Sequence, residues 1–333
     1  MRIRRKVRSV ISRIWPPKPK PLILVYHRIA DKPIDNWGLA VSPTHFEEQL
    51  QVLRRTRHPF PLKDFVCHLM AGTLPSDAVA LTFDDGYVDN LVAGKPRLAA
   101  ADVPATVFLA TGYLDRPGEF WWDELARLIL LEDGPQKVEL TIRGEPVYID
   151  LGSETSRRED GTVRAASLKR RQRALTPIWQ TIRHLDDGER DSVMAELRSI
   201  FAARGDHTHR GRAMTREEVR TLEMDGLVAI GAHTVTHPVL SQLGAIACHR
   251  EIAESKSTCE ALIGKPVASF AYPYGDFDAK ARGAVMAAGF AFACSTQHGP
   301  TIATSDLFGL PRIQVLNWGG DAFERALQQS AGW

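Results

Sequence analysis

Short apolar runs that alternate with helical segments constrain the fold of this chain more than any other feature of its sequence. Seven runs have the composition of strands buried on both faces. They are LILVYH (22–27), AVALTF (78–83), ATVFLA (105–110), LVAIGAH (227–233), VASFAY (267–272), FAFACS (290–295) and LPRIQVL (310–316). Strand and helix in alternation predict an α/β fold with a parallel sheet and right-handed crossovers. About seven such strands fit a closed or nearly closed (β/α) barrel better than a small open sheet.

Helix boundary signals lie between most of these runs. Ser42 before a proline is typical of a helix start, and Thr215 with Glu218 forms a capping box. Residues 246–264 predict another helix, and Gly264 is a typical C-terminal cap.

The region from about 118 to 212 interrupts this rhythm. It contains an aromatic helix start, EFWWDELARLILL, then a hairpin pattern, KVELTIRGEPVYIDL, and then polar helices with a basic run. We predict a mostly helical insertion on the loop face of the barrel, where active sites are built. Trp121 and Trp122 either form the core of this insertion or line the site, with one of them a stacking platform for a sugar ring.

A basic leader and a Pro/Lys tether, residues 1–21, precede the predicted barrel at 22–333. The leader has eight Lys and Arg and no acidic residue. Residues 1–15 carry apolar side chains at roughly helical spacing and end on Trp15, which is typical either of a disordered leader or of an amphipathic segment on an anionic membrane. The chain has no apolar run typical of a signal peptide or a spanning helix. We therefore expect a cytoplasmic location, with peripheral contact at the inner face of the membrane.

The net charge bears on the binding partners of the protein, and the cysteine spacing bears on metal binding. The net charge of +2 gives no reason to expect nucleic acid. Four cysteines are scattered through the chain without the paired spacing of a zinc knuckle, and buried thiols in a reducing compartment explain them: Cys67, Cys248, Cys259 and Cys294.

Two histidines follow the predicted strand 227–233 in the sequence HTVTHPVL. His233 and His237 are four residues apart, so on a single turn both imidazoles face one side and can share a metal ion. Pro238 disfavours a longer helix there. A lone histidine is usually structural, but a pair at this spacing and at a strand exit favours a metal site.

Two adjacent carboxylates, Asp84 and Asp85, end the strand 78–83. An Asp-Asp-Gly sequence is ordinary turn chemistry when it stands alone. Two imidazoles leave a divalent ion short of ligands, however, so one aspartate can bind the ion while the other accepts a proton from water. A third strand end, SFAYPYGDF (269–277), can present backbone N–H groups to a developing oxyanion.

TFDDGY, HTVTH and AYPYG, in this order, resemble the first three motifs of the polysaccharide deacetylases with the NodB homology domain, carbohydrate esterase family 4. The similarity spans most of 22–318, and YHRI, PATVFLATG, FWWDEL, ACST and LPRI are similar to members often associated with bacterial surface polysaccharide synthesis. The family fold is a distorted (β/α) barrel, commonly with seven strands.

The resemblance implies roles for particular residues. Asp84 would be the general base, and three residues would hold a divalent metal, commonly zinc, with cobalt, nickel or manganese as alternatives: Asp85, His233 and His237. The backbone N–H of Tyr274 would help to bind the oxyanion. Three residues are candidate substrate contacts: Tyr272, Pro273 and Trp122.

The sequence departs from the family pattern at two positions. Ala271 stands where the family has an arginine that orients the catalytic aspartate, and Arg312 in LPRI is the candidate substitute. The family's late histidine, the general acid, has no counterpart in IQVLNW. His27 and His298 are the available replacements, and His27 is preferred because it ends the first predicted strand.

These observations favour a metal-dependent hydrolase that removes an N-acetyl group from a sugar of a polysaccharide or a lipid-linked precursor. The alternatives are deformylation of a lipid-linked amino sugar and a catalytically inactive carbohydrate-binding protein. An intact set of four residues argues against the inactive protein: Asp84, Asp85, His233 and His237. A metallophosphoesterase would need more ligands than the motifs supply.

Overall fold

The computed structural model describes residues 19–32, 34–132, 134–152, 165–201 and 211–330. The candidate membrane contact, residues 1–15, lies outside the described residues. Within the described part of the chain, no helix combines the length and apolarity that crossing a bilayer requires.

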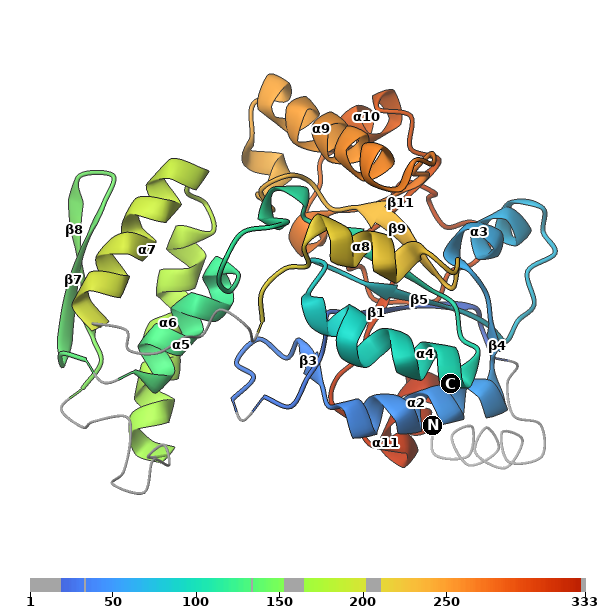
Figure 1. Ribbon diagram of the computed structural model, residues 1–333, viewed down its shortest axis with the longest axis horizontal. Helices are drawn as coiled ribbons and strands as arrows, with labels where there is room; N and C mark the ends of the chain where they lie inside the picture. The colour runs from blue at the N-terminus through green and yellow to red at the C-terminus, as the bar shows by residue number, and fades with distance from the viewer. Residues whose placement is uncertain (1–18, 33, 133, 153–164, 202–210, 331–333) are drawn as a thin grey trace, which may run out of the picture.

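A curled sheet of parallel strands forms the centre of the protein (Figure 1). All seven predicted strands are present, in the spatial order β11-β10-β9-β6-β5-β1-β12, which confirms the expected distorted (β/α) barrel. Their bounds are β1 (Leu22–Tyr26), β5 (Ala78–Phe83), β6 (Ala105–Leu109), β9 (Val228–Ala232), β10 (Ser269–Ala271), β11 (Phe292–Cys294) and β12 (Ile313–Gln314). A short strand, β4 (His58–Pro59), also pairs with β5.

The segment 310–314 brings the two edges of this sheet together. Leu310 forms a parallel bridge with Cys294 of β11, and its carbonyl accepts from the N–H of Ser295 at 2.9 Å. A few residues later, Ile313 pairs with Leu24 of β1. One short segment therefore contacts both edges, so the sheet curls into a nearly closed barrel.

Helices cover the outside of the barrel: α2 (Pro43–Thr56), α3 (Leu62–Met70), α4 (Lys95–Ala101), α8 (Arg216–Glu223), α9 (Ala245–Ile263), α10 (Ala279–Ala287) and α11 (Gly320–Ser330). The predicted caps are confirmed. Ser42 accepts from the N–H of His45, Thr215 and Glu218 complete a capping box, and Gly264 ends α9 in the left-handed conformation.

Short elements complete the described fold. They are β2 (Arg28–Ile29), β3 (Ala40–Val41), the π-helical turn η1 (Asn90–Gly94) and the 3-10 turns η2 (Thr111–Tyr113), η3 (Leu240–Gln242) and η4 (Pro273–Gly275). Strands β2 and β3 pair with each other beside the end of β1.

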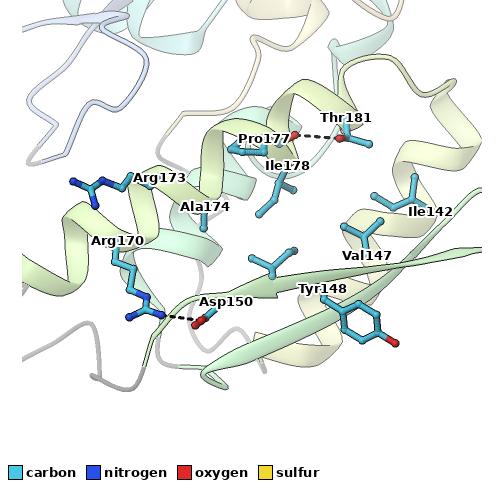
Figure 2. A pocket seen from close by; sticks show the side chains of 11 residues that line it. Ile142, Val147, Tyr148, Asp150, Arg170, Arg173, Ala174, Pro177, Ile178 and Thr181 are labelled. Atoms are coloured by element: carbon cyan, nitrogen blue, oxygen red, sulfur yellow. Dashed lines mark hydrogen bonds and ion pairs between the residues drawn. The ribbon is translucent and has the colours of Figure 1, made fainter.

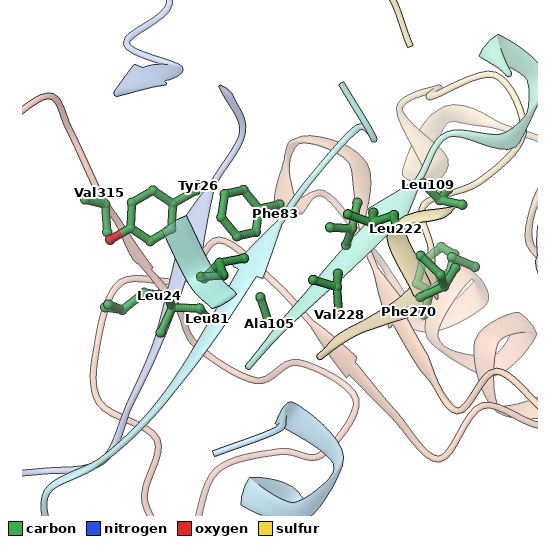
Figure 3. Packing of buried hydrophobic residues seen from close by; sticks show 14 of the residues in the cluster. Leu24, Tyr26, Leu81, Phe83, Ala105, Leu109, Leu222, Val228, Phe270 and Val315 are labelled. Carbon is green, nitrogen blue, oxygen red and sulfur yellow. The ribbon is translucent and has the colours of Figure 1, made fainter. Parts of the chain in front are cut away.

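Rows of apolar side chains across neighbouring strands form the barrel core (Figure 3). One row runs through Leu24, Leu81, Ala105 and Val228, which are paired in register and buried. Burial of large apolar side chains contributes roughly 1.5–3 kcal/mol each. Because this register is shared, the carboxyl ends of β1, β5, β6 and β9 meet at one edge of the barrel.

A second group of elements, the helical lobe, lies beside the barrel (Figure 1). It comprises α5 (Trp121–Leu131), the antiparallel hairpin β7 (Lys137–Ile142) and β8 (Glu145–Asp150), α6 (Ala165–Ile182) and α7 (Asp187–Phe201). The lobe has its own hydrophobic cluster, separate from the barrel core. The hairpin is where the sequence predicts it, whereas the division of the chain at residues 118 and 212 stays a prediction.

The hairpin packs against α6 around a pocket of about 350 Å³ (Figure 2). Val147 and Ile178 line it, and Arg170 pairs with Asp150 at 2.7 Å at one end. Arg171, from the same basic run, is buried and donates to the carbonyls at the end of α5. These two cations of the run therefore hold the lobe together.

Candidate active site

Asp84 follows β5 directly and is held by Arg312 from the far end of the chain. The guanidinium donates to both carboxylate oxygens, Nη1 to Oδ1 at 2.8 Å and Nη2 to Oδ2 at 2.7 Å. Arg312 is buried and also donates to Thr82 and to the carbonyl of Ser295. Burial alone would raise the pKa of Asp84, but the Arg312 guanidinium holds it well below its usual range. Arg312 therefore occupies the position expected of a substitute for the missing arginine.

Asp85 points to the two histidines. Its Oδ1 lies 3.5 Å from Nε2 of His233 and 3.4 Å from Nε2 of His237. The backbone of Asp85 is left-handed, with φ of 73°, and Gly86 continues at 82°. A Cβ on Gly86 would come within 2.7 Å of the Leu109 side chain, so only glycine lets the chain turn here.

The histidine loop differs from the single helical turn that its spacing predicts. Thr234 and His237 both have left-handed backbones, with φ of 68° and 57°, and the segment is a bend. Glu251 of α9 holds this bend by accepting from the N–H groups of Val235 and Thr236 at 2.8 and 2.9 Å. The predicted conformation is wrong because β-branched residues disfavour a lone turn and because a carboxylate from another helix satisfies the loop amides.

The two imidazoles differ in their surroundings. Nδ1 of His233 lies 2.7 Å from the carbonyl of Ala271, so a proton on Nδ1 leaves Nε2 as the free lone pair. Burial would lower the pKa of His233, but the neighbouring carboxylates of Asp85 and Asp84 raise it overall. Burial lowers the pKa of His237 to about 3, so this ring is neutral at physiological pH.

Asp85, His233 and His237 fit the donor set of a divalent metal ion. Their ligand atoms lie within 4.8 Å of one another, and all three side chains are buried. Oδ1 of Asp85 is buried and accepts no hydrogen bond from the described residues. A buried carboxylate oxygen without a donor is costly, and a cation between it and two imidazoles would remove that cost.

These groups open into a pocket of about 370 Å³, the active-site pocket. Its lining residues come from the barrel and from the helical lobe: His27, Trp37, Leu39, Asp84, Asp85, Trp122, Trp179, Arg183, His233, His237, Tyr274, Thr296 and Gln314. The strand-end residues form its floor and the aromatic residues form its walls.

Of the three predicted substrate contacts, only one lines the pocket. Trp122 lines the pocket, and its ring lies 4.8 Å from that of His237. Tyr272 is fully buried, donates to the carbonyl of Phe308 and stacks on Phe277, so it packs behind the loop and cannot contact a ligand in the pocket. Pro273 is likewise buried and does not line the pocket.

The structure also shows which of the remaining predicted residues line the active-site pocket. His27 lines the pocket and is half-buried, whereas His298 is exposed on a loop and does not line it. Tyr274 lines the pocket with its ring 4.6 Å from that of His237. Trp121 and Trp122 both belong to the buried hydrophobic cluster of the lobe, and of the two only Trp122 also lines the active-site pocket.

Sequence reasoning missed several lining residues, among them Trp37, Trp179 and Arg183. Trp37 follows β2, and its ring lies 5.1 Å from that of Trp179 on α6. Arg183 stacks over Trp179 at 4.8 Å and over Tyr274 at 5.7 Å. The available signal was composition, because a tryptophan in an otherwise polar helix, such as Trp179, is unusual; Trp37 lies in a turn between β2 and β3.

A buried polar network anchors the aromatic wall to the barrel. Trp122 donates to the hydroxyl of Tyr87 at 2.7 Å, and Tyr87 donates to Asp123 at 2.8 Å. Arg28 of the YHRI segment contacts Asp123 and Asp89. This network fixes Trp122 against His237.

Comparison with known sequences identifies the class of protein. The sequence model of the polysaccharide deacetylase family matches residues 71–138 and 196–293. The chain belongs to this family, whose members are hydrolases of carbon–nitrogen bonds other than peptide bonds, as the motifs predict. The match leaves out 1–70, 294–333 and an internal stretch, 139–195, whose described residues fall within the helical lobe. No curated protein sequence matches the chain significantly.

Several solved structures share the fold of this chain. The Streptococcus pyogenes deacetylase PplD, in complex with acetate, matches with a TM-score of 0.59 and 18% identity, over 95% of this chain and 100% of that one. IcaB from Ammonifex degensii matches with a TM-score of 0.58 and 16% identity, over 94% of this chain and 98% of that one. The BpsB deacetylase domain from Bordetella bronchiseptica matches with a TM-score of 0.53 and 16% identity, over 88% of this chain and 95% of that one. At these identities the likeness concerns the fold.

Proposed function

We propose that this protein is a metal-dependent hydrolase that removes an N-acetyl group from a sugar of a polysaccharide or a lipid-linked glycan precursor. One observation carries the proposal. An ionised Asp84 held by Arg312 lies beside a buried three-residue donor set at the floor of an aromatic pocket. A base, a metal site and a sugar-sized platform are the parts that amide hydrolysis on a sugar requires.

Asp85, His233 and His237 would hold the ion, and zinc suits one carboxylate and two imidazoles. Cobalt, nickel and manganese also accept these ligands. A divalent ion at this place supplies Lewis acidity, which polarises a carbonyl and makes water more acidic. The protein's contribution is to keep Nε2 of His233 free, through the hydrogen bond from its Nδ1 to the carbonyl of Ala271.

Asp84 would act as the general base. Its low pKa keeps it ionised, and Arg312 occupies one lone pair on each oxygen, so other lone pairs can accept a proton from the attacking water. The bidentate geometry also fixes the direction of the carboxylate. Asp84 would therefore take the proton as the water oxygen bonds to the amide carbon.

Two further residues would complete the reaction. The backbone N–H of Tyr274 would donate to the oxyanion of the tetrahedral intermediate. His27, at the end of β1 and on the pocket wall, would pass a proton to the leaving amine as the carbon–nitrogen bond breaks and acetate forms. His27→Asn tests this acid role, because it should lower kcat while a substrate with a better leaving group is much less affected.

Mass spectrometry of a panel of N-acetylated and N-formylated sugars, free, oligomeric and lipid-linked, tests the proposed function. Loss of one acetyl mass is the expected result. Loss of formyl alone would favour deformylation of an amino sugar. Binding of the sugars without any mass loss, in protein shown to contain metal, would favour an inactive carbohydrate-binding protein and overturn the proposal.

We also propose that the protein acts at the inner face of the cell membrane, on precursors of surface polysaccharide. The basic and apolar pattern of residues 1–15 supports this location. Deleting residues 1–21 should weaken binding to vesicles with anionic lipid and leave binding to neutral vesicles unchanged. Equal binding of both proteins to anionic vesicles would refute the proposed membrane contact.

A further inference from the structure

A second cavity, of about 520 Å³, adjoins the active-site pocket on the other side of the histidine loop. Thr236 and Pro238, which flank His237, line it together with residues of α9 and of the segment between α6 and α7. Arg183 lines both cavities. Four arginines line this second cavity, which we call the arginine cavity: Arg143, Arg183, Arg190 and Arg250.

Arg190 has an unused donor in this cavity. Its side chain is buried, with 2% exposure, and Nη2 pairs with Asp187. Nη1 donates to no acceptor within the described residues. Arg190 also lies in the first turn of α7, a helix of 15 residues whose N-terminal end carries partial positive charge. A buried guanidinium nitrogen without an acceptor is costly, so the site favours a ligand that brings one.

Two more guanidiniums in the cavity form no ion pair within the part of the chain that the structure describes. Arg183 has its guanidinium carbon over the rings of Trp179 and Tyr274, and its Nε donates to Nε2 of His184, which leaves its two terminal nitrogens for a ligand. Arg250 is exposed on α9. Arg143, by contrast, is paired with Glu189.

The acidic residues of the cavity already accept hydrogen bonds from the protein. Glu251 accepts from two loop amides and from the Thr236 hydroxyl. Asp186 accepts from the N–H of Glu189 at 2.8 Å, and Asp187 pairs with Arg190. The carboxylates of Glu251 and Asp187 are therefore engaged by groups of the protein, whereas Arg183 and Arg250 have no carboxylate partner among the described residues and Nη1 of Arg190 has no acceptor there.

We propose that the arginine cavity binds a phosphoryl group attached to the sugar whose acyl group enters the active-site pocket. Arginine suits phosphate because its planar donors match the phosphate oxygens. Arg183 would contact both parts of such a ligand, since it lines both cavities and stacks on the aromatic wall. This inference rests on the proposed function and adds that the substrate is an anionic, phosphate-bearing N-acylated sugar.

Binding of inorganic pyrophosphate to metal-stripped protein, measured by calorimetry, tests the cavity without turnover and without competition from a bound metal. Arg190→Gln and Arg250→Gln should each weaken binding about tenfold, the value of one charge-assisted hydrogen bond. Arg170→Gln, which alters a paired arginine outside the cavity, is the matched control and should change nothing. Arg250 is on the surface, so its variant remains informative if Arg190→Gln fails to fold.

Absence of pyrophosphate binding, or equal weakening by Arg170→Gln, would overturn the proposal. A second measurement separates it from the proposed function. The ratio of kcat/KM for N-acetylglucosamine 1-phosphate to that for N-acetylglucosamine should exceed one and should fall in Arg250→Gln. Deacetylation with a ratio of one would refute the phosphoryl site but not the proposed deacetylase function. Pyrophosphate binding without deacetylation would support the phosphoryl site and refute the deacetylase function.

The phosphoryl group could come from a lipid carrier or from a nucleotide. A short prenyl-pyrophosphate-linked N-acetylated sugar and the corresponding nucleotide diphosphate sugar, compared as substrates, distinguish these sources. Either one with a higher kcat/KM than the neutral sugar supports the site and names its source. If neither substrate has a higher kcat/KM than the neutral sugar, the inference is overturned.

Discussion

The two sides of the active-site pocket are built by different physical means. The barrel side consists of charged groups fixed by short hydrogen bonds, such as Arg312 to Asp84 at 2.7 Å. The lobe side consists mainly of aromatic rings in contact, such as Trp179, whose ring lies 5.1 Å from that of Trp37 at an interplanar angle of 35°. Hydrogen bonds between buried ions fix direction, whereas ring stacking tolerates sliding and recognises shape.

This difference suggests that the barrel side carries out the reaction and that the lobe side recognises the substrate. The barrel side holds the proton acceptor and the metal donors at strand ends, where the sheet fixes their positions. On the lobe side, Trp179 and Arg183 lie within 139–195, which the family match does not cover, whereas Trp122 on α5 lies within the match. Substitutions on the barrel side should therefore affect turnover or metal binding, and those on the lobe side should affect substrate affinity.

Asp84→Asn should have the largest effect. Because the amide cannot accept the proton from water, we expect kcat to fall by about 10²–10⁴-fold, the usual contribution of a positioned base. Metal content, measured by elemental analysis, should be unchanged. Retained turnover in a variant that binds metal and unfolds at a normal temperature would remove Asp84 from the base role.

Arg312→Met should have the largest effect on stability. It leaves the buried carboxylate of Asp84 without its partner, which typically lowers the free energy of unfolding by about 3–5 kcal/mol. Urea denaturation measures this loss. The double variant Asp84→Asn with Arg312→Met should recover much of it, since no buried charge remains. A double variant as unstable as the sum of the two single variants would show that the pair is not coupled.

His237→Ala should abolish stabilisation by metal. A ligand present at a hundredfold excess over its Kd adds about 2.7 kcal/mol to the free energy of unfolding. Wild-type protein stripped of metal should therefore gain stability when zinc is added, and the variant should gain much less. His298→Ala, which alters an exposed histidine outside the pocket, is the matched control. Equal gains in His237→Ala and wild type would place the metal elsewhere.

Trp179→Ala should have the smallest effect and should act on the other side of the pocket. Loss of one stacking surface costs about 0.5–1.5 kcal/mol, which raises KM several-fold with kcat nearly preserved. Tyr148→Ala removes an aromatic side chain of the same lobe that is exposed and distant from the pocket, so it serves as the control. A fall in kcat with unchanged KM in Trp179→Ala would contradict the division between the two sides.

The barrel side was largely predictable. Apolar runs located all seven strands because a strand buried on both faces has a local signature. The carboxylate pair and the histidine pair follow two of these strands, and carboxyl ends of parallel strands meet at one edge, so Asp84, Asp85, His233 and His237 converge as expected. The backbone of the histidine loop was not predictable, because Glu251 from α9 fixes it.

The sequence by itself determined the order of strands and helices along the chain, the barrel class and the residues that follow the strand ends, since each depends on a pattern within about ten residues. Only the tertiary structure decided that Arg312 forms a bidentate ion pair with Asp84, that Tyr272 is buried, and that the rings of Trp37 and Trp179 are in contact. Contacts of that kind depend on barrel closure and lobe docking. Both are set by packing between distant segments, and no local pattern records which distant side chain fills a given space.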